Sequence, residues 1–234
     1  MTPLDIVARD GSSRARAGVL RLAHGEVATP AFVPLATKAT VRGLTPGDVA
    51  DLGYDMVLGN TYHLFIDPGE DLVAGLGGLH RFMRWSRPII ADSGGFQVFS
   101  MGHGTVADEI KGRAAHGGGE RHGKTLGITE DGVSFRSPLD GSTKFLAPET
   151  SMEIQAKLGS DIALVFDECT PFNVTREYTA RSTERTHRWL ERCLDWSERH
   201  GPDGQVVYGI VQGGVYEDLR IASAQTIAAS RAAG

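Results

Sequence analysis

The stretch Pro88-Ile89-Ile90-Ala91-Asp92-Ser93-Gly94-Gly95-Phe96-Gln97 decides how the chain is organised. A run with strand character ends at a carboxylate, and the chain then breaks at once into Ser-Gly-Gly. Paired glycines can adopt positive φ and leave backbone N–H groups uncovered, so a ligand can approach the main chain closely. The aspartate can therefore belong to a functional site, or it can simply cap a tight turn. This stretch by itself leaves both interpretations open.

Four other runs share the near-continuous apolar character that is typical of parallel strands buried on both faces. They are residues 31–35, 55–59, 161–166 and 205–211. Helical segments lie between the runs, beginning at Thr45-Pro46, at Pro148 and at Tyr178. Five such units predict an α/β fold, a (β/α)8 TIM barrel of which residues 30–234 supply about five strands.

Two parts of the sequence depart from this strand–helix rhythm. Residues 1–29 alternate short β-like runs with turn residues and predict a small antiparallel β cap. Residues 102–147 predict an insertion, with a basic, glycine-rich loop at 111–124 followed by a β-hairpin that turns at Asp140-Gly141. The sequence assigns no role to the 111–124 loop.

Composition bounds the class of protein. The chain has 234 residues, 41% of them hydrophobic, which is enough for one sizeable core. A net charge of -5 argues against a generic polyanion binder but leaves room for a local basic surface. Two cysteines without a CxxC motif predict neither a disulfide scaffold nor a cysteine zinc site. Because no signal peptide or membrane span is visible, we expect a soluble, cytoplasmic protein.

The longest predicted helix, over residues 178–199, carries a stripe of arginines at spacings of four, three and four. These are Arg181, Arg185, Arg188 and Arg192. The spacing places them on one face of the helix. We expect a solvated face, since that is the usual role of such a stripe, and an RNA-facing surface is the alternative.

Polar side chains end four of the five predicted strands, namely Asn60, Asp92, Asp167 and Gln212. The C-terminal ends of barrel strands meet at one mouth, so we expect these side chains to share a site. Carboxylates accept hydrogen bonds and amides both donate and accept them, which suits a flat heterocycle. Phe96 could stack on the face of such a ring. The histidines are scattered along the sequence, and we expect no metal site.

Five ordered motifs resemble the bacterial tRNA-guanine transglycosylases, also called queuine tRNA-ribosyltransferases. The motifs are Thr29-Pro30-Ala31-Phe32-Val33-Pro34, Leu58-Gly59-Asn60-Thr61-Tyr62-His63-Leu64, Asp92-Ser93-Gly94-Gly95-Phe96-Gln97, Phe166-Asp167-Glu168-Cys169-Thr170-Pro171 and Gly209-Ile210-Val211-Gln212-Gly213. The resemblance implies a glycosyltransferase (pentosyltransferase) of queuosine biosynthesis. Such an enzyme replaces guanine at wobble position 34 of certain tRNAs with a 7-deazaguanine, through a covalent ribosyl-enzyme. Its partner would be the tRNA anticodon loop, because the wobble base must leave its stack to react.

The same resemblance implies roles for individual residues. Asp92 looks like the acid/base that handles protons on the leaving and entering bases. Asp167 would accept hydrogen bonds from the N1–H and exocyclic amine of the base, and Gln212 would bond its O6/N7 edge. The other residues implied to line the base pocket are Leu58, Asn60, Ser93, Gly94, Gly95, Phe96, Gln97, Cys169 and Gly213.

Three features of intact members have no counterpart in these residues. The resemblance places a nucleophilic aspartate, a Gly-Gly-Leu pocket segment and a structural zinc site of three cysteines and one histidine nearer to the C-terminus. We therefore expect the N-terminal portion of the enzyme, an incomplete barrel domain that is inactive by itself. A homodimer is implied for the full-length protein.

Two other functions stay open at this point. The first is a non-catalytic tRNA-binding subunit or an inactive fragment, since the nucleophile is not among these residues. The second is an amidohydrolase-like barrel, which would require a bound metal ion.

Overall fold

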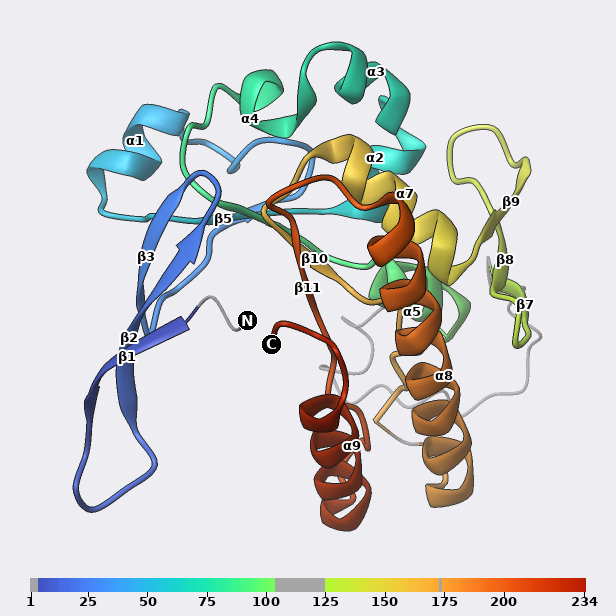
Figure 1. Cartoon of the computed structure of the whole chain (residues 1–234). Helices are drawn as coiled ribbons and strands as arrows, with labels where there is room; N and C mark the ends of the chain where they lie inside the picture. The colour runs from blue at the N-terminus through green and yellow to red at the C-terminus, as the bar shows by residue number, and fades with distance from the viewer. Residues whose placement is uncertain (1–3, 104–124, 173) are drawn as a thin grey trace.

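The computed structural model describes residues 4–103, 125–172 and 174–234, and its centre is a five-stranded parallel sheet (Figure 1). The strands are β4 (Leu35–Ala36), β5 (Val57–Gly59), β6 (Ile89–Ala91), β10 (Ile162–Leu164) and β11 (Val206–Tyr208). They lie side by side in chain order, and every neighbouring pair is parallel. A doubly wound sheet would reverse its direction part-way, whereas a barrel wall advances one strand at a time. The predicted α/β class with buried parallel strands is confirmed.

Helices connect the strands and cover the sheet. They are α1 (Pro46–Asp51), α2 (Thr61–Ile66), α3 (Glu70–Gly75), α4 (Gly78–Met83), α5 (Gly95–His103), α7 (Pro148–Leu158), α8 (Arg176–His200) and α9 (Glu217–Ala229). Thr45 caps α1 as predicted, in a reciprocal capping box with Asp48. The long α8 begins and ends within two residues of the predicted helix and packs between α7 and α9 (Figure 1). None of the helices in the described ranges is both long enough and apolar enough to cross a membrane.

The predicted antiparallel cap is also present. Its strands are β1 (Leu4–Arg9), β2 (Arg16–Leu22) and β3 (Gly25–Thr29), paired in that order. Leu20 and Val27 of the cap are buried against Met56 and Ile162, which lie where β5 and β10 begin. The cap therefore covers the N-terminal end of the parallel sheet.

The insertion between α5 and α7 contains one more strand than predicted. β8 (Val133–Arg136) and β9 (Thr143–Leu146) form the predicted hairpin, and β7 (Thr125–Ile128) pairs with the other side of β8. The sequence signal for β7 was hidden because its residues follow directly on the glycine-rich tract. That tract, 111–124, lies outside the described residues.

The first parallel strand is shorter than the sequence predicts. A strand over 31–35 was expected, but β4 spans only Leu35–Ala36. Pro34 has no N–H to donate, and it joins the sheet only through its carbonyl, which accepts a bond of 2.9 Å from the N–H of Leu58. Prolines at 30 and 34 thus confine pairing to the end of the run.

The two edges of the parallel sheet are β4 and β11. Beyond β11, the N–H of Ala233 donates to the carbonyl of Val207 and the N–H of Gly209 donates to the carbonyl of Gly234, both at 2.8 Å. Residues 233–234 thus extend the hydrogen bonding along β11. The other edge, at β4, exposes the side chain of Leu35.

A buried carboxylate joins the cap to the parallel sheet. Asp161, at the start of β10, accepts bonds from the N–H of His24 at 3.0 Å and the N–H of Ile89 at 2.8 Å. The ring nitrogens of His24 and His80 lie 2.8 and 3.1 Å from its two oxygens. Burial by itself would raise the pKa of Asp161, but the bonds from His80, Ile89 and His24 outweigh it and lower the pKa below 3.8. The ionised carboxylate is therefore the form that stabilises this junction.

We predict that Asp161→Asn lowers the free energy of unfolding by about 2–4 kcal/mol, because an amide cannot accept bonds from all of these donors. Urea denaturation at pH 7 measures the change. In the wild type, ionised Asp161 stabilises the fold fully above its ordinary pKa of 3.8. This stabilisation is lost as the pH falls from that value through the lower pKa that Asp161 has in the folded chain. Asp203→Asn, at an exposed position, serves as the control. A loss no larger than that of the control would contradict the assignment.

Candidate active site

The polar residues that end the predicted strands come together in two hydrogen-bonded groups. Asn60, after β5, donates its side-chain Nδ2–H to the carboxylate of Asp92, after β6. Gln212, after β11, donates its Nε2–H to the carboxylate of Asp167, after β10, at 2.6 Å. The polar residues thus follow four neighbouring strands at the same, C-terminal, end of the sheet, as parallel strands in a barrel wall require.

Asp92 is held by donors from the start of α2, the turn after β6 and helix α5. Its Oδ1 accepts bonds from the N–H of Thr61 at 2.8 Å and the N–H of Gly94 at 3.2 Å. Its Oδ2 lies 3.4 Å from the Nε2 of Gln97 in α5. Burial raises the pKa of Asp92 to about 6, which these bonds oppose and the nearby charge of Asp167 reinforces. A carboxyl group that titrates near neutral pH can both give and take a proton.

Asn60 is a helix cap and a partner of the site at the same time. Its Oδ1 accepts the N–H of His63 at 3.0 Å, which caps α2, while its Nδ2 faces Asp92. The hydroxyl of Thr61 donates to the main-chain carbonyl of Asp92. The capping and functional interpretations of these strand ends are therefore compatible, because one side chain does both.

Asp167 is almost fully buried, with 5% of the residue exposed. Ser93 donates its hydroxyl to Oδ1 at 2.8 Å, and Gln212 donates to Oδ2. Burial raises the pKa of Asp167 to about 6 against these two bonds and a third from its own backbone N–H. The two carboxylate oxygens have four lone pairs between them, so the group can accept more than these bonds.

The glycine pair brings the two groups into contact. Gly94 has a φ of +80°, which favours glycine. A Cβ on Gly95 would lie 2.5 Å from the main-chain oxygen of Asp167 and 2.8 Å from its Oδ1. The turn after β6 can therefore lie directly against the turn after β10 only because no side chain stands between them.

The other predicted pocket residues lie in more varied surroundings. Phe96 is 47% exposed at the start of α5, and Leu58 is half-buried within β5. Cys169 packs against the main core. Gly213 has a φ of +117° and lies against the backbone of Arg220. These positions are compatible with the predicted pocket, and the lining roles of these residues stay predictions.

Helix α7 supplies support that sequence reasoning missed. The hydroxyl of Ser151 donates to the carbonyl of Ser93 at 2.7 Å. The fully buried amide of Gln155 binds both backbone groups of Leu164 in β10, at 2.8 and 2.9 Å. Both side chains hold the chain near the site rather than touching its carboxylates. A serine and a glutamine inside an amphipathic helix carry no sequence signal for this role.

One cluster of potential metal ligands occurs among the described residues, and it lies at the other end of β10. It consists of His24, His80 and Asp161. The two imidazole rings are stacked, with centroids 3.5 Å apart and planes inclined by 19°. A metal ion lies in the plane of each ring that binds it, which two stacked rings cannot both satisfy for one ion. The cluster is therefore a hydrogen-bonded junction, and sequence analysis missed it because Asp161 lies 137 and 81 positions from the histidines.

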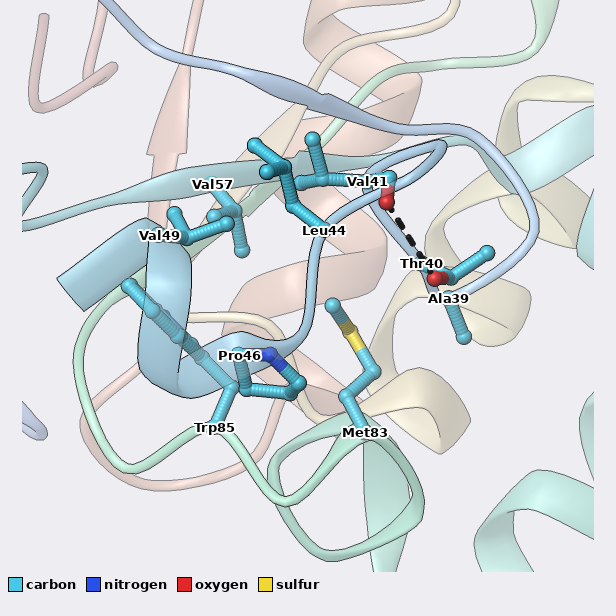
Figure 2. Close-up of a pocket in the computed structure, with 9 residues that line it drawn as sticks. All are labelled: Ala39, Thr40, Val41, Leu44, Pro46, Val49, Val57, Met83 and Trp85. Carbon is cyan, nitrogen blue, oxygen red and sulfur yellow. Dashed lines mark hydrogen bonds between the residues drawn. The ribbon is translucent and has the colours of Figure 1, made fainter. Parts of the chain in front are cut away.

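A small pocket lies beside α1, between the loop that precedes this helix and the end of α4 (Figure 2). Its lining includes Val41, Leu44, Met83 and Trp85. None of the nine side chains that line it is charged. It offers an apolar surface rather than the donors and acceptors that the edge of a heterocycle needs, so the strand-end carboxylates remain the candidate active site.

Comparison with known proteins agrees with the motifs that the site contains. The family model described as queuine tRNA-ribosyltransferase matches residues 10–234. The chain belongs to this family. The matched range includes both carboxylates, the glycine pair and the supporting helix α7.

Curated relatives show the same similarity along almost the whole chain. The queuine tRNA-ribosyltransferase of Roseiflexus sp. (strain RS-1) is 48% identical over 230 residues, which cover 94% of this chain and 57% of the relative. That of Pelotomaculum thermopropionicum is 46% identical over 95% of this chain and 54% of the relative. That of Moorella thermoacetica is 46% identical over 96% of this chain and 54% of the relative. The chain spans about half the length of the curated relatives it matches.

We predict that Gly95→Ala separates the two turns and lowers the free energy of unfolding by about 1–3 kcal/mol, as overpacking does. The added Cβ meets backbone, which cannot move aside as a flexible side chain can. Gly75→Ala in α3 is the matched control, because its Cβ would meet nothing within 4 Å. Urea denaturation of both variants measures the difference. Equal stabilities would contradict the packing described for Gly95.

Proposed function

We propose that this chain provides the base-binding half of a tRNA-guanine transglycosylase, with Asp92 as acid/base. The observation that carries the proposal is a pair of carboxylates, half-buried Asp92 and buried Asp167, held at neighbouring strand ends by amide, hydroxyl and backbone donors. The substrate would be guanine at wobble position 34 of tRNA, exchanged for a 7-deazaguanine precursor of queuosine. Membership of the queuine tRNA-ribosyltransferase family supports this proposal.

The hydrogen-bonding capacity of Asp167 and Gln212 matches one edge of guanine. The carboxylate of Asp167, which already accepts the hydroxyl of Ser93 and the amide of Gln212, would accept the N1–H and the exocyclic amine of the base. The Nε2 of Gln212 carries two hydrogens; one is used on Asp167, and the other can reach the O6/N7 edge. Adenine has an acceptor at N1 and a donor at C6, so it would present the wrong pattern at both places.

Asp92 can serve proton transfer for a physical reason. A general acid/base works best when its pKa lies near the working pH, and burial raises the pKa of Asp92 to about 6. The departing guanine gains electron density when its glycosidic bond breaks, and a proton from Asp92 would neutralise it. The entering base would return a proton to the same carboxylate. The attack on the ribose would use a nucleophile that the resemblance places outside these residues.

The structural zinc of the full-length family does not fit the cysteines of this chain. The family pattern needs three cysteines, and the chain has two, Cys169 and Cys193. Burial raises the pKa of Cys193 to about 12, which keeps it a neutral thiol, and its Sγ lies 3.7 Å from the carbonyl of Pro148. We therefore route no step through zinc. Closure of the eight-stranded barrel, dimerisation of the full-length protein and action in the cytoplasm remain proposals drawn from the family.

A non-catalytic tRNA-binding subunit is the alternative, and the raised pKa values of the two acids argue against it. Two carboxylates with raised pKa values cost stability at neutral pH, since each is more stable protonated in the folded chain. A protein that only holds an RNA backbone would need cations in these places. Carboxyl groups with raised pKa values are typical of active sites that transfer protons, as base exchange does.

We predict that this chain binds guanine, and that Asp167→Asn weakens the binding about 10- to 100-fold, because an amide nitrogen would face the donors of the base. Ligand-observed NMR with guanine and adenine measures both affinity and selectivity. By itself the chain should bind the base without exchanging it into tRNA. Asp203→Asn is the control for a change of charge far from the site. Equal binding of adenine and guanine would refute the proposal.

A further inference from the structure

The residue after Asp167 is a buried acid that the proposed chemistry does not use. Glu168 is 1% exposed. Its Oε1 accepts the hydroxyl of Tyr178 at 2.6 Å, and its Oε2 lies 2.5 Å from the Nη1 of Arg185. Its main-chain N–H donates to the hydroxyl of Thr186 at 3.1 Å. Helix α8 thus supplies all the partners of Glu168 named here.

Arg185 is shared between this acid and the inserted antiparallel sheet. Its Nε donates at 3.0 Å to Glu130, which lies in the turn between β7 and β8. Arg188 also donates to Glu130, at 2.9 Å from two nitrogens. The indole N–H of Trp189 donates to the main-chain carbonyl of Glu130 at 2.8 Å. The insertion is therefore fixed to α8 at the turn between β7 and β8.

This arrangement corrects the expectation for the arginine stripe in part. A solvated face was expected, with RNA binding as the alternative, but three of the four arginines pair with acids of neighbouring elements. Arg192 binds Glu149 of α7 at 2.6 and 2.7 Å. The side chain of Arg185 is only 22% exposed. Arg185 and Arg192 are thus partly buried and fasten the insertion and α7 to α8, whereas Arg181 and Arg188 stay exposed, as a solvated face predicts.

Arg185 neutralises a buried negative charge next to the base site. A buried carboxylate without a cation is strongly unfavourable, and it would repel a second carboxylate on the adjacent residue. The guanidinium presents several donors in a fixed plane, so it can serve Glu168 and Glu130 at once. Removal of Arg185 would leave Glu168 buried with only the hydroxyl of Tyr178 and no compensating charge among the pairs described.

We propose that Arg185 is a positioning residue for the base site: it balances the charge of Glu168 beside the base acceptor Asp167, and through Glu130 it joins that part of the site to the inserted sheet. The role of Asp167 as the base acceptor rests on the proposed function. The salt-bridge chain from Glu130 to Glu168 does not, since it follows from the contacts themselves.

The surroundings of Asp167 set the direction in which its pKa should change when Arg185 is removed. Burial raises the pKa of Asp167, and the charge of Glu168 adds to the rise. Loss of the compensating guanidinium should therefore raise it further. The titratable and charged groups around Asp167 and Glu168 are Asp92 after β6, Glu130 in the β7–β8 turn, and Tyr178, Arg185 and Cys193 in α8.

The test is a 13C NMR titration of the Asp167 carboxyl in this chain without ligand. Arg185→Met should raise the midpoint by about one pH unit, and Arg185→Lys should restore part of the difference by returning the charge. Arg188→Met is the matched control, because Arg188 pairs with Glu130 but not with Glu168, and it should leave the midpoint unchanged. Equal midpoints for Arg185→Met and Arg188→Met would overturn the proposal.

A second variant keeps the test decisive if Arg185→Met fails to fold. Glu168→Gln removes the adjacent negative charge and should lower the Asp167 midpoint, whereas an unchanged midpoint would overturn the proposal. Guanine binding is then measured across the same pH range. If the wild type does not bind guanine, the proposed function fails while the titration still decides the role of Arg185. If guanine binds and the Arg185→Met midpoint does not move, only the role of Arg185 fails.

Discussion

The contact between the turns after β6 and β10 is the constraint on which the rest of the site depends. Ser93 spans it by donating to Asp167, and Gly95 permits it because any Cβ would collide with Asp167. This contact places half-buried Asp92 near buried Asp167, and desolvation raises the pKa of each carboxyl to about 6. Acids shielded from water in this way are unfavourable when ionised at neutral pH, and the hydrogen bonds that they accept offset part of this cost.

The strands that carry the two acids are neighbours in space although a long insertion separates them in the chain. β6 pairs with β10 directly, and β7, β8 and β9 lie outside that pairing as a separate sheet. The insertion is fastened back to α8 through Glu130, and α8 in turn supports Glu168 beside Asp167. The opposite end of β10 is fixed by Asp161. β10 is therefore anchored at both ends, which suits a strand that presents a rigid acceptor.

The sequence predicted what depends on local pattern. Buried strands read as apolar runs, and the residues that end them, Asn60, Asp92, Asp167 and Gln212, do meet at one side of the sheet. It could not predict contacts between distant polar residues, such as Asp161 with His80, because no local pattern marks them. The arginine stripe was predicted only in part for the same reason: its periodicity reveals a face, but the acids that pair with Arg185, Arg188 and Arg192 come from other elements.

The titration of Asp167 with and without guanine tests the central claim most directly. A base that donates N1–H and amine hydrogens binds the ionised carboxylate, so saturating guanine should lower the Asp167 midpoint well below its free value of about 6. The carboxyl carbon of Asp167 reports this in a 13C NMR titration of the chain. A midpoint that stays the same or rises when guanine is bound would contradict the account.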